Sequence, residues 1–207
     1  MCIRDRFGTP GRQPSNSYGL KSIGKGCVSK EFNAFFLRKT SPAAEWARAL
    51  ARDLHERGDG PGVGMVGMCF TGGFALAAMA DEHVLAPVLS QPSLPFPLSK
   101  GHKSDLGIDE GTLVSIRERA ADGACVLGLR FTADKLVPPE RFDRLRKELG
   151  AGFLSVEIDS SKGNPHGIKA TAHSVLTEDL VDEPGHPTQE ALTKVFDFFD
   201  ERLKTSA

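Results

Sequence analysis

The sequence predicts an α/β protein in which a mostly parallel sheet is covered by helices on both faces. Strand-like and helix-like segments alternate from about residue 33 to the carboxyl end. The strand-like runs, such as 63–69 and 124–131, are short and continuously apolar, as strands buried on both faces are. With 207 residues in total, we expect residues 27–207 to form a single domain.

The amino end is expected to be irregular over residues 1–26. Its first six residues, MCIRDR, lack the apolar core of a secretory signal and resemble an adapter-derived scar. The stretch that follows, 7–26, is rich in Gly, Pro, Ser and Asn and is typical of a loop. One interpretation is that the first strands of the domain lie upstream of Phe7 and are missing; the other is a short disordered arm.

The first half of the domain begins with a strand expected at about 33–37. Ser41 as N-cap and Pro42 at the first helical position predict a helix that ends near Gly58. An apolar stripe that includes Trp46 predicts which face of this helix is buried, and Trp46 is interpreted as a core residue. The expected elements that follow are a strand at 63–69, a buried helix at 74–81 and a strand at 84–92.

The second half starts with an irregular stretch at 93–107, of which residues 93–104 are a candidate lid. Asp109 caps a predicted helix that runs to about Ala121. Pro138 opens a later helix that Gly150 closes. The remaining expected elements are strands at 124–131 and 153–159, a polar loop to about Pro187 and an amphipathic helix at 188–203 with Phe198 and Phe199 in the core.

The composition excludes several classes of function. Lys plus Arg is 26 and Asp plus Glu is 27, so no basic excess favours nucleic acid as a partner. No apolar run approaches the roughly 20 residues that cross a bilayer. The four cysteines form no C-x-x-C pair, which indicates reduced thiols in a cytoplasmic protein. His and Cys also lack the spacing of metal ligands, so no metal is expected.

The stretch GMCFTGG, residues 67–73, places Cys69 between a buried strand and a buried helix. Ligands of open α/β sheets bind at the carboxyl ends of strands, and a nucleophile at such a sharp turn is the nucleophile elbow, usually G-x-S-x-G. Thr71 stands where the second glycine is expected. The non-functional interpretation is a buried structural cysteine. A phosphate-binding loop fits poorly because the Walker lysine is absent.

A thiol at this position has suitable chemistry for a nucleophile. A helix N-terminus stabilises the thiolate, and the backbone N–H of Phe70 would point into the same pocket as an oxyanion donor. The thiol also needs a base and an orienting acid. Asp134 follows the strand at 124–131, where an α/β-hydrolase carries its acid.

Three histidines follow the last predicted strand and are candidates for the base. His173 and His166 are both suitable by position, and spacing alone does not choose between them. His186 abuts the last helix and is interpreted as a cap residue. Cys69, Asp134 and a histidine at three strand ends together predict a Cys-His-Asp triad.

At these three sites the chain resembles the dienelactone hydrolase family of α/β-hydrolases. GMCFTGG resembles its G-x-C-x-G-G elbow, TADKLVPPERF its acid loop, and AHSVLT its His-Ser loop. The resemblance implies the α/β-hydrolase fold, with the first strands missing here. It also implies Cys69 as nucleophile, His173 as base and Asp134 as the orienting acid. The implied reaction is hydrolysis of a small ester or lactone through a thioester, with no cofactor.

One departure from the family bears on the substrate. Thr177 falls where substrate-binding members carry an arginine for the substrate carboxylate, which puts the dienelactone itself in doubt. The expected partner is therefore a small-molecule ester or lactone, and the chain is expected to be a monomer or a homodimer.

Two other functions remain as alternatives. A glutamine amidotransferase-like hydrolase also has a cysteine elbow, but its histidine is followed two residues later by Glu, whereas Val175 follows His173. The other alternative is an inactive fragment or binding module. Cys125 is expected to be inert in the middle of a strand, and Phe35 and Phe36 are expected in the core.

Overall fold

The structure is a computed structural model that describes residues 37, 39 and 41–204. Its centre is a four-stranded sheet in which every pair of neighbouring strands is parallel and the spatial order follows the chain. The strands are β1 (Val63–Met68), β2 (Val84–Ser90), β3 (Val126–Phe131) and β4 (Phe153–Ile158). This sheet confirms the predicted α/β class.

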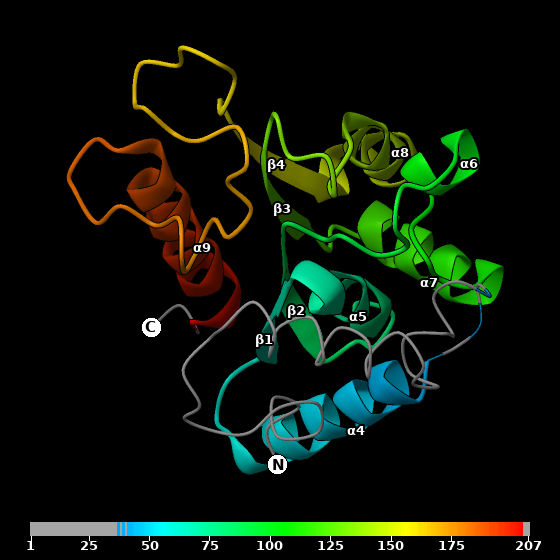
Figure 1. Cartoon of the computed structure of the whole chain (residues 1–207). Coiled ribbons are helices and arrows are strands. Elements are labelled where there is room, and N and C mark those ends of the chain that lie inside the picture. The colour runs from blue at the N-terminus through cyan, green and yellow to red at the C-terminus, as the bar shows by residue number, and fades with distance from the viewer. Residues whose placement is uncertain (1–36, 38, 40, 205–207) are drawn as a thin grey trace, which may run out of the picture.

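Helices cover both faces of the sheet, as predicted (Figure 1). On one face lie α5 (Gly72–Ala78), α7 (Glu110–Ala121) and α8 (Pro139–Leu149), with α4 (Pro42–Arg57) packed against α5. The opposite face is covered by α9 (Pro187–Leu203). Three short elements complete the described part of the chain: η1 (Cys69–Thr71), α6 (Lys100–Lys103) and η2 (Gly150–Gly152). No helix in the described part of the chain has the length and apolar composition needed to cross a membrane.

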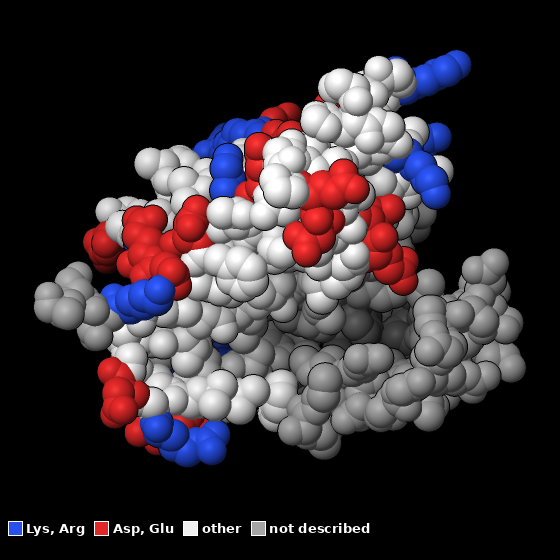
Figure 2. Space-filling view, turned by 90° about the vertical axis from the view of Figure 1, so that its left-hand side faces the viewer, with Lys and Arg blue, Asp and Glu red and all other residues white. Residues whose placement is uncertain are grey.

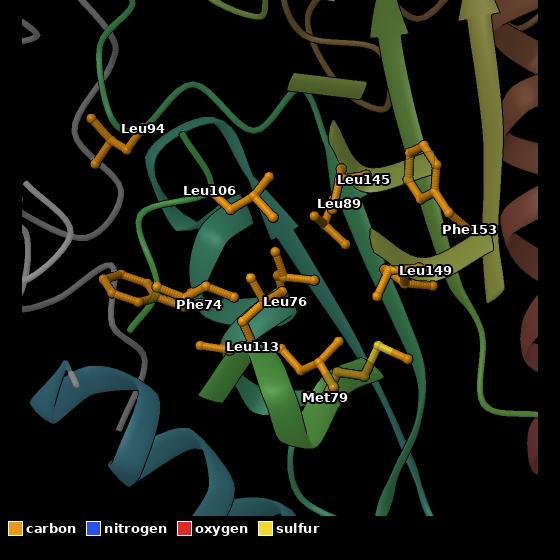
Figure 3. Close-up of a cluster of buried hydrophobic side chains, with 14 of the residues drawn as sticks. Phe74, Leu76, Met79, Leu89, Leu94, Leu106, Leu113, Leu145, Leu149 and Phe153 are labelled. Carbon is orange, nitrogen blue, oxygen red and sulfur yellow. The ribbon is translucent and has the colours of Figure 1, made fainter. Parts of the chain in front are cut away.

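The larger core cluster fills the space between the sheet and the helices α5, α7 and α8 (Figure 3). Leu76 of α5 and Met79, which caps that helix, share this cluster with Leu89 of β2, and side chains of α7, α8 and β4 complete it. Burying a side chain of this size contributes roughly 1.5–3 kcal/mol. A second cluster beneath α9 joins Val195 and Phe198 to β2, β3 and β4, so α9 is held by apolar contact with the sheet.

Three predicted helix boundaries are confirmed by their caps, whereas the helix predicted at 74–81 is observed as Gly72–Ala78. The side chain of Ser41 accepts a hydrogen bond from Ala43 N (3.3 Å), and Pro42 occupies the first helical position of α4. Asp109 caps α7 in the same way. Gly150 closes α8 with a φ of +53°, a conformation that favours glycine.

Predictions about three residues, Trp46, Cys125 and Phe199, are corrected. Trp46 is 41% exposed because α4 meets α5 through its alanines, which allow the two helices to approach closely. Cys125 lies one residue before β3, not in the middle of a strand, and is partly exposed. The prediction for Phe198 is confirmed, whereas Phe199 is only partly buried.

Some expected segments differ in detail. The stretch 93–107 contains the short helix α6. In β4 only the terminal residues Phe153 and Ile158 are buried, and the residues between them are partly or fully exposed. The cause is that, within the described sheet, β4 pairs with β3 alone. The strand predicted at 33–37, with Phe35 and Phe36, lies outside the described residues except for Leu37.

A buried arginine fixes the loop that follows β2. Arg141 of α8 is 1% exposed, and burial lowers the pKa of its guanidinium to about 10, against the smaller raising effect of Asp105. Its guanidinium donates to four backbone carbonyls of the stretch 92–105. The acceptors are those of Pro92 (2.8 Å), Asp105 (3.0 Å), His102 (3.1 Å) and Pro95. One side chain therefore determines the path of this loop.

We expect Arg141→Met to lower the free energy of unfolding by at least about 3 kcal/mol, because it leaves buried carbonyls without donors. Urea denaturation measures the loss. The matched control is Arg146→Met on the same helix, where the lost ion pairs with Asp143 and Glu157 lie near the surface. That loss should be about 0–1 kcal/mol. Equal losses in the two variants would contradict the role of Arg141.

Candidate active site

Cys69 stands at a sharp turn between β1 and α5. Its φ of +52° lies in the left-handed region of backbone conformation, which residues other than glycine rarely adopt. The turn is tight on both sides. A Cβ at Gly67 would lie 2.4 Å from the carbonyl oxygen of Thr71, and one at Gly72 would lie 2.6 Å from Pro92 Cβ. Both glycines are therefore required by close approach, and the geometry is that of a nucleophile elbow.

Thr71, the departure from the usual elbow pattern, has a specific structural role. Its hydroxyl accepts a hydrogen bond from Met68 N (2.9 Å) and donates one to Met68 O (2.8 Å). A glycine at this position would make neither bond. The close approach that the pattern assigns to this glycine is instead provided one residue later, at Gly72.

The three residues predicted as a triad are brought together at the carboxyl ends of the strands. Cys69 Sγ lies 3.1 Å from His173 Nε2, and His173 Nδ1 lies 2.7 Å from Asp134 Oδ2. The Asp134 side chain is 5% exposed and that of His173 is 23% exposed. The imidazole therefore bridges a thiol and a buried carboxylate.

The structure also distinguishes the three candidate histidines. His166 is exposed, and its ring packs edge-on against that of His186, with centroids 5.4 Å apart. His186 is the N-cap of α9, as predicted, and accepts a hydrogen bond from Thr188 N. His173 is the histidine that contacts the sulfur.

The environment of His173 favours its protonated form. Burial lowers the pKa of the imidazole, but the hydrogen bonds to Asp134 and Cys69 and the charges of these two partners outweigh burial. Together they raise the pKa of His173 from 6.5 to about 10. A protonated His173 lies 3.1 Å from the sulfur, an arrangement that stabilises a thiolate.

A buried arginine supports the loop that carries Asp134. Arg130 of β3 is 2% exposed and donates to the carbonyls of Thr132 and Val137, both at 3.0 Å. Its charge is paired with Glu157 of β4. Within the loop, Asp134 Oδ1 accepts from Leu136 N (2.9 Å), which leaves Oδ2 to accept from the imidazole.

Two polar side chains that sequence reasoning missed hold the His173 loop. Asp179 Oδ2 accepts from the backbone N of His173 and of Ser174, both at 2.9 Å. Gln91, which follows β2 with a φ of +41°, accepts from Val175 N (3.3 Å) and from the hydroxyl of Ser90. The signal for Gln91 was its place at the carboxyl end of a strand beside the elbow.

Ser93 is a third residue that was not predicted. It is fully buried, its backbone N donates to Cys69 O (3.1 Å), and its hydroxyl lies 3.3 Å from Cys69 Sγ. Phe70, the predicted oxyanion donor, directly follows Cys69 in η1, and its ring meets that of Phe96 edge-on at 5.4 Å. The loop after β2 therefore supplies one side of the site.

Other features are separate from this site. Cys125 is a free thiol whose Sγ accepts a hydrogen bond from Arg202 Nη2 (3.0 Å) near the start of β3. Among the described residues, no three His, Cys, Asp or Glu side chains are grouped as metal ligands would be. On the face formed by α9 and the loop before it, acidic side chains are prominent (Figure 2).

Of the solved structures compared below, one has a TM-score above 0.5 and supports the fold. A protein from Klebsiella pneumoniae subsp. pneumoniae that is assigned as a dienelactone hydrolase is 17% identical, with a TM-score of 0.52, over 96% of this chain and 72% of its own. Two other solved structures match less well. The monoacylglycerol lipase of Paleococcus ferrophilus has 13% identity, a TM-score of 0.46 and coverage of 75% of this chain and 73% of its own. An esterase of Pyrococcus furiosus has 9% identity, a TM-score of 0.46 and coverage of 78% and 60%.

The chain therefore has the α/β-hydrolase fold. No family model matches the sequence, and no curated protein matches it either.

We expect Thr71→Val to lower the free energy of unfolding by about 1–2 kcal/mol, because it removes both hydrogen bonds to Met68 at nearly constant volume. Thr71→Ser, which keeps the hydroxyl, is the matched control and should lose less. Urea denaturation of the two variants gives the comparison. If valine and serine were equivalent at this position, the hydroxyl would not support the elbow.

We also expect the His173 imidazole to keep its proton through neutral pH and to lose it near pH 10. The raised pKa means that this proton stabilises the fold fully below about pH 6.5 and that the contribution is lost as the pH rises through about 10. NMR of labelled histidine measures the titration. Cys69→Ala removes two of the raising effects and should lower the midpoint. A wild-type midpoint at the ordinary value would contradict the ion pair.

Proposed function

We propose that this chain is a cysteine-dependent hydrolase of small carboxylic esters or lactones. In this proposal Cys69 is the nucleophile, His173 transfers protons and Asp134 orients His173. The observation that carries the proposal is the continuous contact from sulfur to imidazole to carboxylate, 3.1 Å and 2.7 Å, at a nucleophile elbow. The α/β-hydrolase fold supports it, because its ligands bind at this end of the sheet.

The first half of the proposed reaction transfers the acyl group to sulfur. The Cys69 thiolate attacks the ester carbonyl carbon, a C–S bond forms, and the π electrons move to oxygen as an oxyanion. Its negative charge would be stabilised by the backbone N–H of Phe70. When the oxyanion collapses, the C–O bond to the alcohol breaks, and the leaving oxygen takes the proton from His173 Nε2. A thioester and a neutral imidazole remain.

The second half releases the acid. Neutral His173 accepts a proton from water as the water oxygen attacks the thioester carbonyl carbon. Collapse of the second oxyanion breaks the C–S bond, and the electron pair returns to sulfur as the thiolate. His173 holds the proton that it took from water, so the resting ion pair is restored. The sum is ester plus water to carboxylic acid plus alcohol.

The substrate class follows from the resemblance and from one departure. The similarity of the three loops to the dienelactone hydrolase family favours a lactone or a small ester. Thr177, which is exposed, occupies the position where substrate-binding members of that family have an arginine. We therefore propose esters and lactones in general, with no requirement for a carboxylate on the substrate.

The glutamine amidotransferase alternative is less well supported. Its acid would lie two residues after the histidine, where this chain has Val175, a fully buried residue of the core cluster beneath α9. The carboxylate that meets His173 Nδ1 comes from Asp134, which follows β3. This order of nucleophile, acid and histidine is that of the α/β-hydrolases.

We expect Cys69→Ala to reduce the hydrolysis of p-nitrophenyl acetate by at least about 10³-fold, because no nucleophile remains. Spectrophotometric assay of nitrophenolate gives the rate, and intact-mass analysis of the quenched wild type should detect acetyl on Cys69. Cys125→Ala, which removes the other described thiol, is the matched control and should retain the wild-type rate. Turnover that survives in Cys69→Ala would refute the proposal.

A further inference from the structure

The Cys69 sulfur has a second polar partner besides His173. The hydroxyl of Ser93 lies 3.3 Å from Sγ, and Ser93 is fully buried. A buried hydroxyl needs a hydrogen-bond partner, because it has no access to water. The sulfur is the partner of this hydroxyl, and it is also the atom that would react.

The backbone of Ser93 has a separate function from its side chain. Its N–H donates to the carbonyl of Cys69 (3.1 Å) and so helps to hold the turn. The preceding carbonyl, of Pro92, accepts from the buried guanidinium of Arg141 (2.8 Å). These backbone contacts fix the position of Ser93 without its side chain. The hydroxyl is therefore not needed for the fold of this turn and can form a hydrogen bond with the sulfur.

We propose that Ser93 is a further catalytic residue, whose hydroxyl donates a hydrogen bond to the Cys69 thiolate. The inference rests on the proposed function only in so far as the thiolate is the nucleophile. The direction of the bond follows from the arrangement around the sulfur. The sulfur meets both His173 Nε2 and the Ser93 hydroxyl, and a thiolate has no proton to donate, so in the proposed nucleophile the sulfur accepts from both.

The hydrogen bond would change in strength during the reaction. A thiolate is a strong acceptor, whereas the sulfur of a thioester is neutral and a weak one. Ser93 therefore stabilises the sulfur when it is free and contributes little once sulfur carries an acyl group. The hydroxyl thus stabilises the anionic sulfur and makes sulfur a better leaving group when water attacks the thioester.

The test measures the rate at which iodoacetamide alkylates Cys69 as a function of pH, with the modified peptide identified by mass. The charged groups in this contact chain are the imidazole of His173 and, behind it, the carboxylate of Asp134. We expect Ser93→Ala to move the midpoint of the profile up by about one pH unit, because a hydrogen bond to a charged group is lost. Below the midpoint the rate falls about tenfold.

Ser41→Ala is the matched control. It removes another buried hydroxyl, 4% exposed and bonded to Ala43 N at the start of α4, and should leave the midpoint unchanged. Ser93→Gly lacks the same hydroxyl and should shift the midpoint as alanine does, which keeps the test open if one variant is unstable. An unchanged midpoint in a folded Ser93 variant overturns the inference. Because alkylation needs no ester, a wild type without hydrolytic activity would refute the proposed function and leave this result intact.

Discussion

The left-handed backbone of Cys69 is the constraint on which the site depends. Holding a residue other than glycine in this conformation costs of order 1–3 kcal/mol of free energy, so contacts with the surrounding structure must stabilise it. They do so from three directions. Thr71 fastens the turn to the last residue of β1, Ser93 N holds the Cys69 carbonyl, and Gly72 lets α5 approach the loop after β2. The strain directs the sulfur away from the core and toward the imidazole.

The same principle applies to the other two members of the contact chain. Both lie on loops, and polar side chains hold each loop by hydrogen bonds to its backbone atoms. Arg130 holds the carbonyls on either side of Asp134, and Asp179 and Gln91 hold the N–H groups around His173. The distances of 3.1 Å and 2.7 Å therefore depend on buried polar groups with satisfied hydrogen bonds.

Much of this arrangement could be predicted from the sequence, because its signals are local. Alternating elements, caps such as Ser41 and Asp109, and the positions of Cys69 and Asp134 after strands all report on nearby backbone. The prediction that Trp46 lies in the core was wrong because burial depends on which side of α4 packs against α5. That side is determined by the size of the residues that face each other. Ser93, Gln91 and Asp179 were missed because their partners are distant in the sequence or are backbone groups, for which side-chain patterns give no signal.

Arg141 has a consequence for how the rim of the site can vary. Its guanidinium donates hydrogen bonds to backbone carbonyl oxygens of the segment between β2 and α7, and every amino acid has such an oxygen. The exposed side chains of this segment, such as Leu98, are thus open to exchange, unlike the buried Ser93 and Leu94. New exposed side chains would alter the wall beside Phe96 without changing the carbonyls that Arg141 binds. Insertions or deletions would move the oxygens out of register with a guanidinium of fixed shape. Divergence of this rim is therefore expected in composition and not in length.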